Sequence, residues 1–147
     1  MTITLILFTA LAALASASPL TKRAGGPAIV PIPSDCPTTN PLPASTGYMP
    51  TPDTVYQEFY TSSRPASEVA QECFDQCYGF GAPGTCKAAV LAYNVPTPEG
   101  YYGTAGGVLE ISCMMFEDYL DETSFAEAPA GQYTNETAAN IYCQRSS

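Results

Sequence analysis

The most regular pattern of apolar and polar positions in the chain predicts a single helix, from Ala66 to Tyr78. Its apolar face recurs at helical spacing and consists of Val69, Ala70, Cys73 and Cys77. Its polar face carries Glu68, Gln71, Glu72, Asp75 and Gln76. Ser67 and Glu68 supply a cap and an acidic first turn, and Gly79 follows the last turn, as is common where a helix ends.

Four other stretches have patterns typical of strands. They are Thr54–Thr61, Cys86–Val95, Val108–Phe116 and Asn140–Cys143. The second is a run of Ala, Val and Leu that indicates burial, whereas the third alternates Leu109, Ile111, Cys113 and Met115 with Glu110, Ser112 and Met114. The stretch Glu117–Gly131 is acidic and is predicted to be irregular. Together these elements predict an α+β fold, with one helix packed on a small antiparallel sheet.

The first 23 residues have the composition of targeting and processing segments. The apolar run from Thr2 ends in Ala15-Ser16-Ala17, the small-x-small pattern of a signal peptidase site, which predicts a signal peptide at 1–17. A transmembrane helix needs about 20 apolar residues, so an uncleaved anchor is the weaker alternative. The segment 18–23 ends in Lys22-Arg23, a pair that resembles a furin- or kexin-type processing site rather than two merely solvated charges. Cleavage at both places gives a mature chain that begins at Ala24.

The next segment, 24–52, is predicted to be an extended, weakly packed arm. It contains eight of the fourteen prolines, which fix φ and remove backbone donors. Cys36 is expected to be its one firm attachment. The remainder, 53–147, then forms a single domain.

Charge and composition restrict the function. The mature chain keeps three basic residues, Arg64, Lys87 and Arg145, against fourteen Asp and Glu residues, a net charge of −11. Such a charge disfavours nucleic acid and anionic membrane surfaces as partners. The chain has no histidine, which excludes Ser-His-Asp and Cys-His catalysis and His-containing zinc sites. We therefore expect no catalytic residues, no metal and no cofactor.

Six cysteines lie after the predicted cleavage points, and an even number in an exported chain predicts three disulfides. Cys73 and Cys77 are four apart on the helix, so both sulfurs point toward the same layer. That geometry favours Cys77–Cys86 and Cys73–Cys113, which leaves Cys36–Cys143. Many other pairings are open, and spacing alone does not choose among them.

The order of these cysteines resembles the PAN/apple family of extracellular modules. The matching pieces are Glu72-Cys73-Phe74-Asp75-Gln76-Cys77, Cys86-Lys87-Ala88-Ala89-Val90-Leu91-Ala92-Tyr93-Asn94 and Ser112-Cys113-Met114-Met115-Phe116. In apple-like modules, two helical cysteines are linked to two following strands and an outer disulfide joins the ends. The layout is also similar to that of short secreted fungal proteins. The resemblance implies a non-catalytic binding module for protein or carbohydrate, secreted and either free or associated with the cell wall, as an effector or wall protein.

Three weaker signals complete the prediction. Asn135-Glu136-Thr137 is a sequon and predicts an N-linked glycan on Asn135. Tyr101 and Tyr102, between glycines in the loop Pro96–Gly107, are the candidate ligand contacts, because tyrosine offers contact area at low entropic cost. An acidic cluster is interpreted as a solvated loop, with a metal site or a small carboxylate-dependent hydrolase as alternatives; it comprises Glu117, Asp118, Asp121, Glu122 and Glu127. A structural surface protein without a defined ligand is the other alternative.

Overall fold

The structure is a computed structural model, and it describes residues 26–146. The predicted signal peptide, its cleavage residue Ala17 and the dibasic pair Lys22-Arg23 lie outside the described residues. Between residues 26 and 146, no helix has the length and hydropathy that are needed to cross a bilayer.

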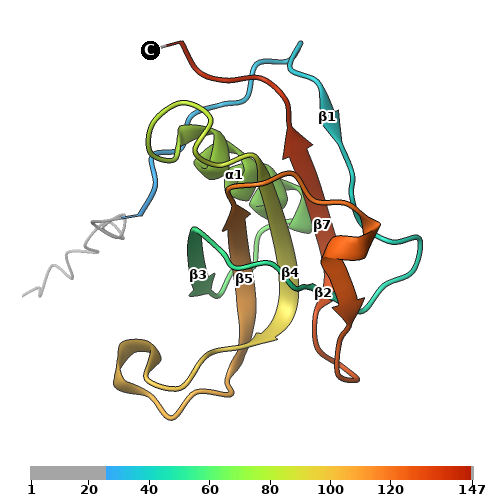
Figure 1. Ribbon diagram of the computed structural model, residues 1–147. Helices are drawn as coiled ribbons and strands as arrows, with labels where there is room; N and C mark the ends of the chain where they lie inside the picture. The colour runs from blue at the N-terminus through green and yellow to red at the C-terminus, as the bar shows by residue number, and fades with distance from the viewer. Residues whose placement is uncertain (1–25, 147) are drawn as a thin grey trace, which may run out of the picture.

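The architecture is α+β: one helix lies on one face of a five-stranded antiparallel sheet (Figure 1). The helix α1 spans Ala66–Gly79, close to its predicted bounds. The strand order in the sheet is β1-β7-β4-β5-β3. These strands are β1 (Thr38–Thr39), β7 (Thr134–Ile141), β4 (Ala88–Pro96), β5 (Leu109–Phe116) and β3 (Tyr56–Tyr60). The central strand β4 pairs with β5 on one side and with β7 on the other.

Three disulfides tie the helix and the arm to the sheet: the two pairs that the helix geometry favours and the pair that they leave. Cys73–Cys113 joins α1 to β5, and Cys77–Cys86 joins the end of α1 to the residues before β4. Cys36–Cys143 joins the arm to the residues after β7. Between residues 26 and 146, no cysteine is free.

The helix face of the sheet forms the first hydrophobic core. The buried side of α1 packs against alternate residues of β4 and β5, which follow the period of two in a strand. This core contains Val69, Ala70, Cys73, Cys77, Ala89, Leu91, Ile111, Cys113 and Met115.

The opposite face of the sheet is also buried, which the alternation predicted for Val108–Phe116 does not suggest. Ser112, Met114 and Phe116 alternate with the helix-facing residues of β5, and all three are almost completely buried. The stretch that follows β5 covers them, with Leu120 and Phe125 in this second core. The prediction of an irregular stretch at 117–131 is therefore wrong in part: it contains a short 3-10 helix, η2 (Glu122–Ser124), and the strand β6 (Phe125–Glu127).

The buried amide of Asn140 on β7 holds this covering segment in place. Its Oδ1 accepts a hydrogen bond from the backbone N–H of Leu120 at 2.9 Å, and its Nδ2 donates to the carbonyl of Leu120 at 2.8 Å. A buried amide that satisfies both backbone groups of one residue fixes the position of that residue. Asn140 thus anchors the covering segment to the sheet.

The arm 26–52 is packed at several places, so the expectation of weak packing with Cys36 as its one attachment is wrong. The strand β2 (Tyr48–Pro50) pairs with β6, and β1 pairs with β7. The backbone N–H of Ile32 donates to the Asp75 carboxylate on α1 at 3.1 Å. The prolines do not prevent these contacts, because backbone donors between them remain available.

The last strand begins earlier than predicted. The sequence predicts a strand at Asn140–Cys143, whereas β7 spans Thr134–Ile141. Its first half has an exposed face, with Asn135 and Thr137 exposed, and this polar composition hides it from a search for apolar runs.

The carboxylate of Glu136 on β7 is expected to stabilise the attachment of the arm. It accepts hydrogen bonds from the backbone N–H groups of Gly47 at 2.7 Å and Tyr48 at 2.9 Å. The substitution Glu136→Ala leaves both donors without an acceptor and should lower the free energy of unfolding by about 2 kcal/mol, as measured by urea denaturation. The exposed Glu117 is the control, and Glu117→Ala should change stability by less than about 0.5 kcal/mol. Equal effects of the two substitutions would show that the contact contributes nothing.

Candidate functional site

The loop between β4 and β5 has a well-defined backbone. At its base, the N–H of Thr97 donates to the carbonyl of Val108, and the N–H of Gly107 donates to the carbonyl of Thr97. At its tip is the single 3-10 turn η1 (Tyr101–Gly103), which follows Gly100 at φ 83°. A positive φ favours glycine at that position. The loop therefore presents its side chains from a fixed scaffold.

Tyr101 faces inward from this loop and supports it. Its ring packs against Phe59 of β3 in an edge-to-face contact, with 4.9 Å between ring centroids. Its hydroxyl accepts a hydrogen bond from the backbone N–H of Phe59 at 3.2 Å and lies 3.4 Å from the carbonyl of the same residue, to which it donates. The side chain therefore fastens the loop to the edge of the sheet.

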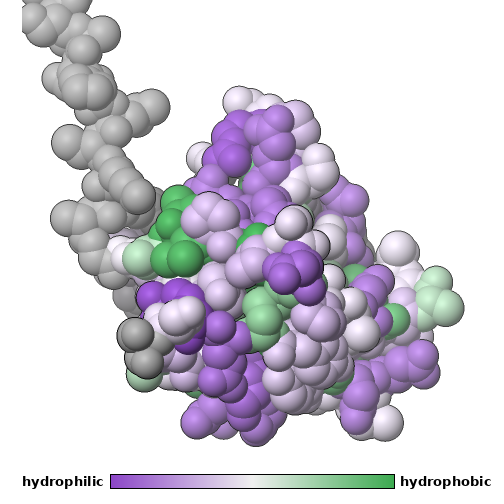
Figure 2. All heavy atoms as spheres, turned by 90° about the horizontal axis from the view of Figure 1, so that it is seen from above, coloured by the Kyte–Doolittle hydropathy of each residue, from purple (hydrophilic) through white to green (hydrophobic). Residues whose placement is uncertain are grey.

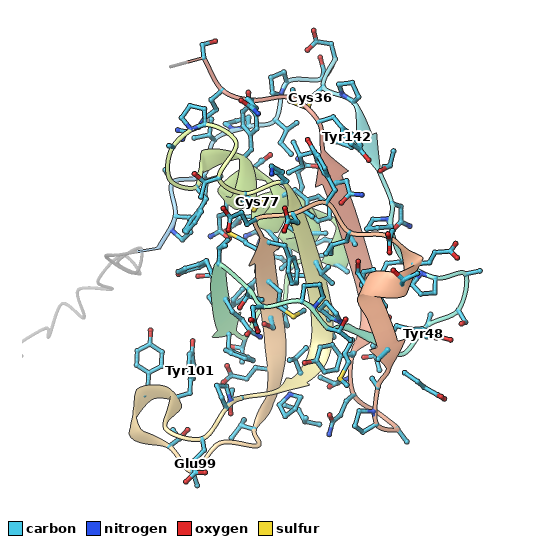
Figure 3. All side chains as sticks on the ribbon, in the orientation of Figure 1. Cys36, Tyr48, Cys77, Glu99, Tyr101 and Tyr142 are labelled. Carbon is cyan, nitrogen blue, oxygen red and sulfur yellow. A yellow bond between two sulfur atoms is a disulfide. The ribbon has the colours of Figure 1, made fainter. Side chains whose placement is uncertain are left out.

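Tyr102 points outward and belongs to an exposed apolar surface at this end of the sheet. Tyr102 is 77% exposed, and Val108 and Leu109 are 55% and 49% exposed. We call these three residues the loop patch. A recess of about 140 Å³ lies beside them and is lined by Thr97, Tyr101, Tyr102, Thr104, Val108 and Glu110. In Figure 3 the loop, marked by Glu99 and Tyr101, lies at the opposite end of the molecule from Cys36 and Tyr142.

A second concavity lies between β3 and α1. This groove has a volume of about 450 Å³ and is bordered by residues of the arm. Glu58 and Tyr60 line it from β3, and Val69, Glu72 and Gln76 line it from α1.

The view in Figure 2 looks onto the end of the molecule near Cys36. Most of this surface is hydrophilic, and hydrophobic side chains gather in one place on its left.

The electrostatics of this groove disfavour ionised tyrosine. Burial, together with the nearby Glu58 carboxylate, raises the pKa of Tyr56 to about 12. Burial also raises the pKa of Tyr60 well above its usual range, and Glu58 and Glu72 add to that effect. The hydroxyl of Tyr56 lies 3.4 Å from the Glu58 carboxylate and donates to it. Both hydroxyls therefore stay neutral over a wider range of pH than an exposed tyrosine.

A pair of stacked tyrosines near the outer disulfide is not predicted by the sequence. The rings of Tyr119 and Tyr142 lie 4.7 Å apart at an interplanar angle of 26°, and the ammonium group of Lys87 lies 5.8 Å from the Tyr119 ring centroid. The two tyrosines come from distant parts of the chain and share no motif. No local signal could have paired them.

The acidic cluster does not converge on one point. Asp121 caps the turn η2: its carboxylate accepts hydrogen bonds from the N–H and hydroxyl of Thr123 at 2.8 and 2.6 Å, and these bonds lower its pKa. Asp118 lies 3.8 Å from the ammonium group of Lys87. Within 26–146, no group of three or more acidic, cysteine or histidine side chains is arranged to hold a metal ion.

Asn135 lies on the exposed side of β7 with a positive φ of 49°. Its side chain is therefore accessible at the surface, as an acceptor of a glycan must be. The occupancy of Asn135 stays a prediction.

The chain matches no protein-family model, and no curated protein or solved structure matches it significantly. The resemblance to apple-like modules therefore rests on the cysteine order and the arrangement of helix and strands alone.

Tyr101 and Tyr102 should differ sharply in their effect on stability. Removal of the Tyr101 ring leaves a cavity against Phe59, so Tyr101→Ala should lower the free energy of unfolding by about 3 kcal/mol. Tyr101→Phe loses only the hydrogen bonds and should cost about 1 kcal/mol. Tyr102→Ala removes an exposed ring whose edge-to-face contact with Tyr101 has 4.6 Å between centroids, and it should cost about 1 kcal/mol or less in the same urea denaturation. A similar cost for both alanine variants would contradict the inward role of Tyr101.

Stability should fall at alkaline pH because of the groove tyrosines. The pKa of Tyr56 is about 12 in the folded chain, whereas its ordinary value is 10.0. At a pH between these two values, unfolding therefore releases the proton of the Tyr56 hydroxyl. The contribution of the neutral Tyr56 hydroxyl to the free energy of unfolding is fully present below about pH 10, and it is lost as the pH rises toward about 12. Tyr60, whose pKa is also raised, forms no side-chain hydrogen bond with the described residues, so Tyr60→Phe removes a titrating group and little else. Urea unfolding at several pH values should show a shallower alkaline decline in Tyr60→Phe, with little change near neutral pH; parallel curves would exclude this mechanism.

Proposed function

We propose that this chain is a secreted, non-catalytic binding module that recognises a protein partner through the loop patch. The observation that carries this proposal is the cluster of three exposed apolar side chains, Tyr102, Val108 and Leu109, beside a recess on a well-anchored loop. Exposed apolar patches on small proteins commonly mark interaction sites.

The chemistry of the patch favours a protein over a carbohydrate. Val108 and Leu109 are aliphatic, and aliphatic side chains pack against apolar protein surfaces. Sugar recognition uses aromatic platforms with several polar groups, whereas here Tyr102 is the one aromatic ring that is largely exposed on the loop. The carboxylate residue Glu110 lines the recess beside the patch, and the chain has a net charge of −9, so the partner is expected to have an apolar centre and a basic rim.

The distribution of titratable groups supports a non-catalytic role. The chain has no histidine, and the acidic residues after β5 cap a turn or lie in solvent. A hydrolase with paired carboxylates needs both groups to face a substrate cleft. Neither of the concavities described above contains residues of the acidic cluster.

Secretion and an apple-like identity belong to the same proposal. Three disulfides suit an oxidising compartment, and the apolar run at 1–17 suits export. The pairing of two helical cysteines with two following segments, and an outer disulfide between the chain ends, support the resemblance to apple-like modules. The overall layout, with a dibasic site after the export signal and a sequon at Asn135, supports a fungal secreted glycoprotein.

The test is a binding screen with protein recovered from the medium of a secreting culture, whose mass also reports the mature N-terminus and the occupancy of Asn135. The wild type and the double variant Tyr102→Ala/Leu109→Ser are screened against a panel of extracellular proteins and a panel of glycans. We expect a protein ligand whose affinity falls at least tenfold in the double variant, since central apolar contacts dominate interfaces.

The matched control is Val55→Ser, which changes an exposed apolar residue just before β3, away from the loop. It should bind as the wild type does. Binding of a glycan that is lost when Tyr102 is changed would show that the patch recognises a carbohydrate and not a protein. Self-association without any ligand, insensitive to the double variant, would overturn the proposal in favour of a structural surface protein.

A further inference from the structure

Two exposed tyrosines lie against each other near the outer disulfide. Tyr119 and Tyr142 are each 45% exposed, and their rings stack with 4.7 Å between centroids at an interplanar angle of 26°. Figure 3 shows Tyr142 at the end of the molecule that also carries Cys36. Of the ten tyrosines, all of which lie within residues 26–146, Tyr102 is the one other that is exposed. Two of the three exposed tyrosines therefore form a stacked pair.

Hydrogen bonds hold the backbone at both residues of this pair. The backbone N–H of Tyr142 donates to the carbonyl of Pro37 in the arm at 3.0 Å. Tyr119 immediately precedes Leu120, whose backbone N–H and carbonyl are bound by the buried amide of Asn140 at 2.9 and 2.8 Å. Asn140 itself lies two residues before Tyr142 on the same segment. The fold therefore brings the two rings together.

The composition of the chain directs one-electron oxidation to tyrosine. Thiols, tryptophan and tyrosine are the side chains that lose a single electron most readily. The chain has no tryptophan, and no cysteine within residues 26–146 is free. A phenol that loses one electron and one proton becomes a phenoxyl radical, whose unpaired electron is shared with the ring carbons next to the oxygen. Two such radicals combine most efficiently when the fold already holds their rings in contact.

We propose that Tyr119 and Tyr142 form a site of oxidative cross-linking, at which an extracellular haem peroxidase with hydrogen peroxide joins the two rings as dityrosine. Each phenol loses one electron and one proton, and a carbon–carbon bond forms between ring carbons next to the two oxygens. The hydrogen atoms on those carbons then move to the oxygens and restore both phenols. Hydrogen peroxide takes up the two electrons and the two protons and leaves as two molecules of water.

The new bond joins the segment that covers the second core to the end of β7. Tyr119 belongs to that segment, and Tyr142 follows β7 and precedes Cys143 of the outer disulfide. The cross-link therefore supplements the disulfide with a bond that reducing agents do not break. The reaction does not depend on a ligand at the loop patch, because Tyr102 takes no part in it.

A second pair of tyrosines in contact has a different geometry and serves as an internal control. The rings of Tyr101 and Tyr102 are 4.6 Å apart, but they meet edge to face at 74°. Tyr101 is also held from the other side, since its ring packs on Phe59 and its hydroxyl bonds to the backbone of that residue. The Tyr101 ring is thus fixed in an orientation in which the ring carbons of the pair are not stacked. We expect little coupling there.

The test uses protein recovered from the medium of a secreting culture and treated with a haem peroxidase and hydrogen peroxide. Tyr119→Phe and Tyr142→Phe keep the rings but lack the phenol, and Tyr102→Phe is the control at the other exposed position. After reduction of the disulfides, cleavage on the C-terminal side of Asp and Glu places Tyr119 and Tyr142 on separate peptides.

In the wild type and in Tyr102→Phe, mass spectrometry of monomeric protein should find these two peptides joined, with two hydrogen atoms fewer than their sum. The yield should fall about tenfold or more in Tyr119→Phe and in Tyr142→Phe. Absence of the joined peptides from the wild type, or an unchanged yield in Tyr142→Phe, would overturn the proposal. Dimers linked through Tyr102 as the main product would overturn it as well, because exposure and not stacking would then select the tyrosine.

A further comparison does not depend on how the variants fold. Wild-type protein that is reduced, alkylated and unfolded in urea before oxidation has lost the contact between Tyr119 and Tyr142. Its yield of the joined peptides should be lower than that of the folded protein by about tenfold or more. Equal yields from the folded and the unfolded chain would refute the role of the stacked pair. Because no ligand is present in any sample, these results are separate from those of the binding screen.

Discussion

The disulfide between Cys73 and Cys113 is the contact on which the rest of the structure depends. It joins the middle of α1 to the middle of β5, and both cysteines are fully buried in the first core. Without it, a single helix of 14 residues would depend on packing against the sheet alone. On the chain-entropy model a loop of this length contributes about 4 kcal/mol, a large share of the total stability of a small domain. The position of the helix in turn sets one wall of the groove beside β3 and provides the Asp75 carboxylate to which the arm binds.

The sheet is buried on both faces, and its second cover comes from the segment after β5 together with the arm. The amide of Asn140 holds Leu120, and β2 pairs with β6 above the second core. This arrangement leaves the end of the sheet near Leu109 without a cover. The loop patch is exposed because α1 on one face, and the segment after β5 with the arm on the other, end before the β4–β5 loop. Tyr101 packs on Phe59 behind the patch.

The loop patch and the groove between β3 and α1 differ in how much of them the sequence could predict. Tyr101 and Tyr102 are found together from their glycine-flanked loop, but their opposite roles depend on Phe59, which is distant in the chain. The groove could not be predicted, because Glu58, Gln76 and Gly26 come from three separate segments. The stacking of Tyr119 on Tyr142 could not be predicted either, because the two residues are distant in the chain and meet only in the folded structure.

The sequence by itself determined the helix and the central strands, because these follow from local periodicity. The four-residue spacing of Cys73 and Cys77 favoured two of the disulfides, and the structure fixed all three pairs. Only the tertiary structure decided the course of the arm, the order in the segment 117–131 and the start of β7 at Thr134. Those segments are polar or rich in proline, and their conformations are set by hydrogen bonds to distant residues, such as those of Glu136 and Asn140. Such bonds leave no periodic pattern in the chain, so they become visible only when the partners are placed in space.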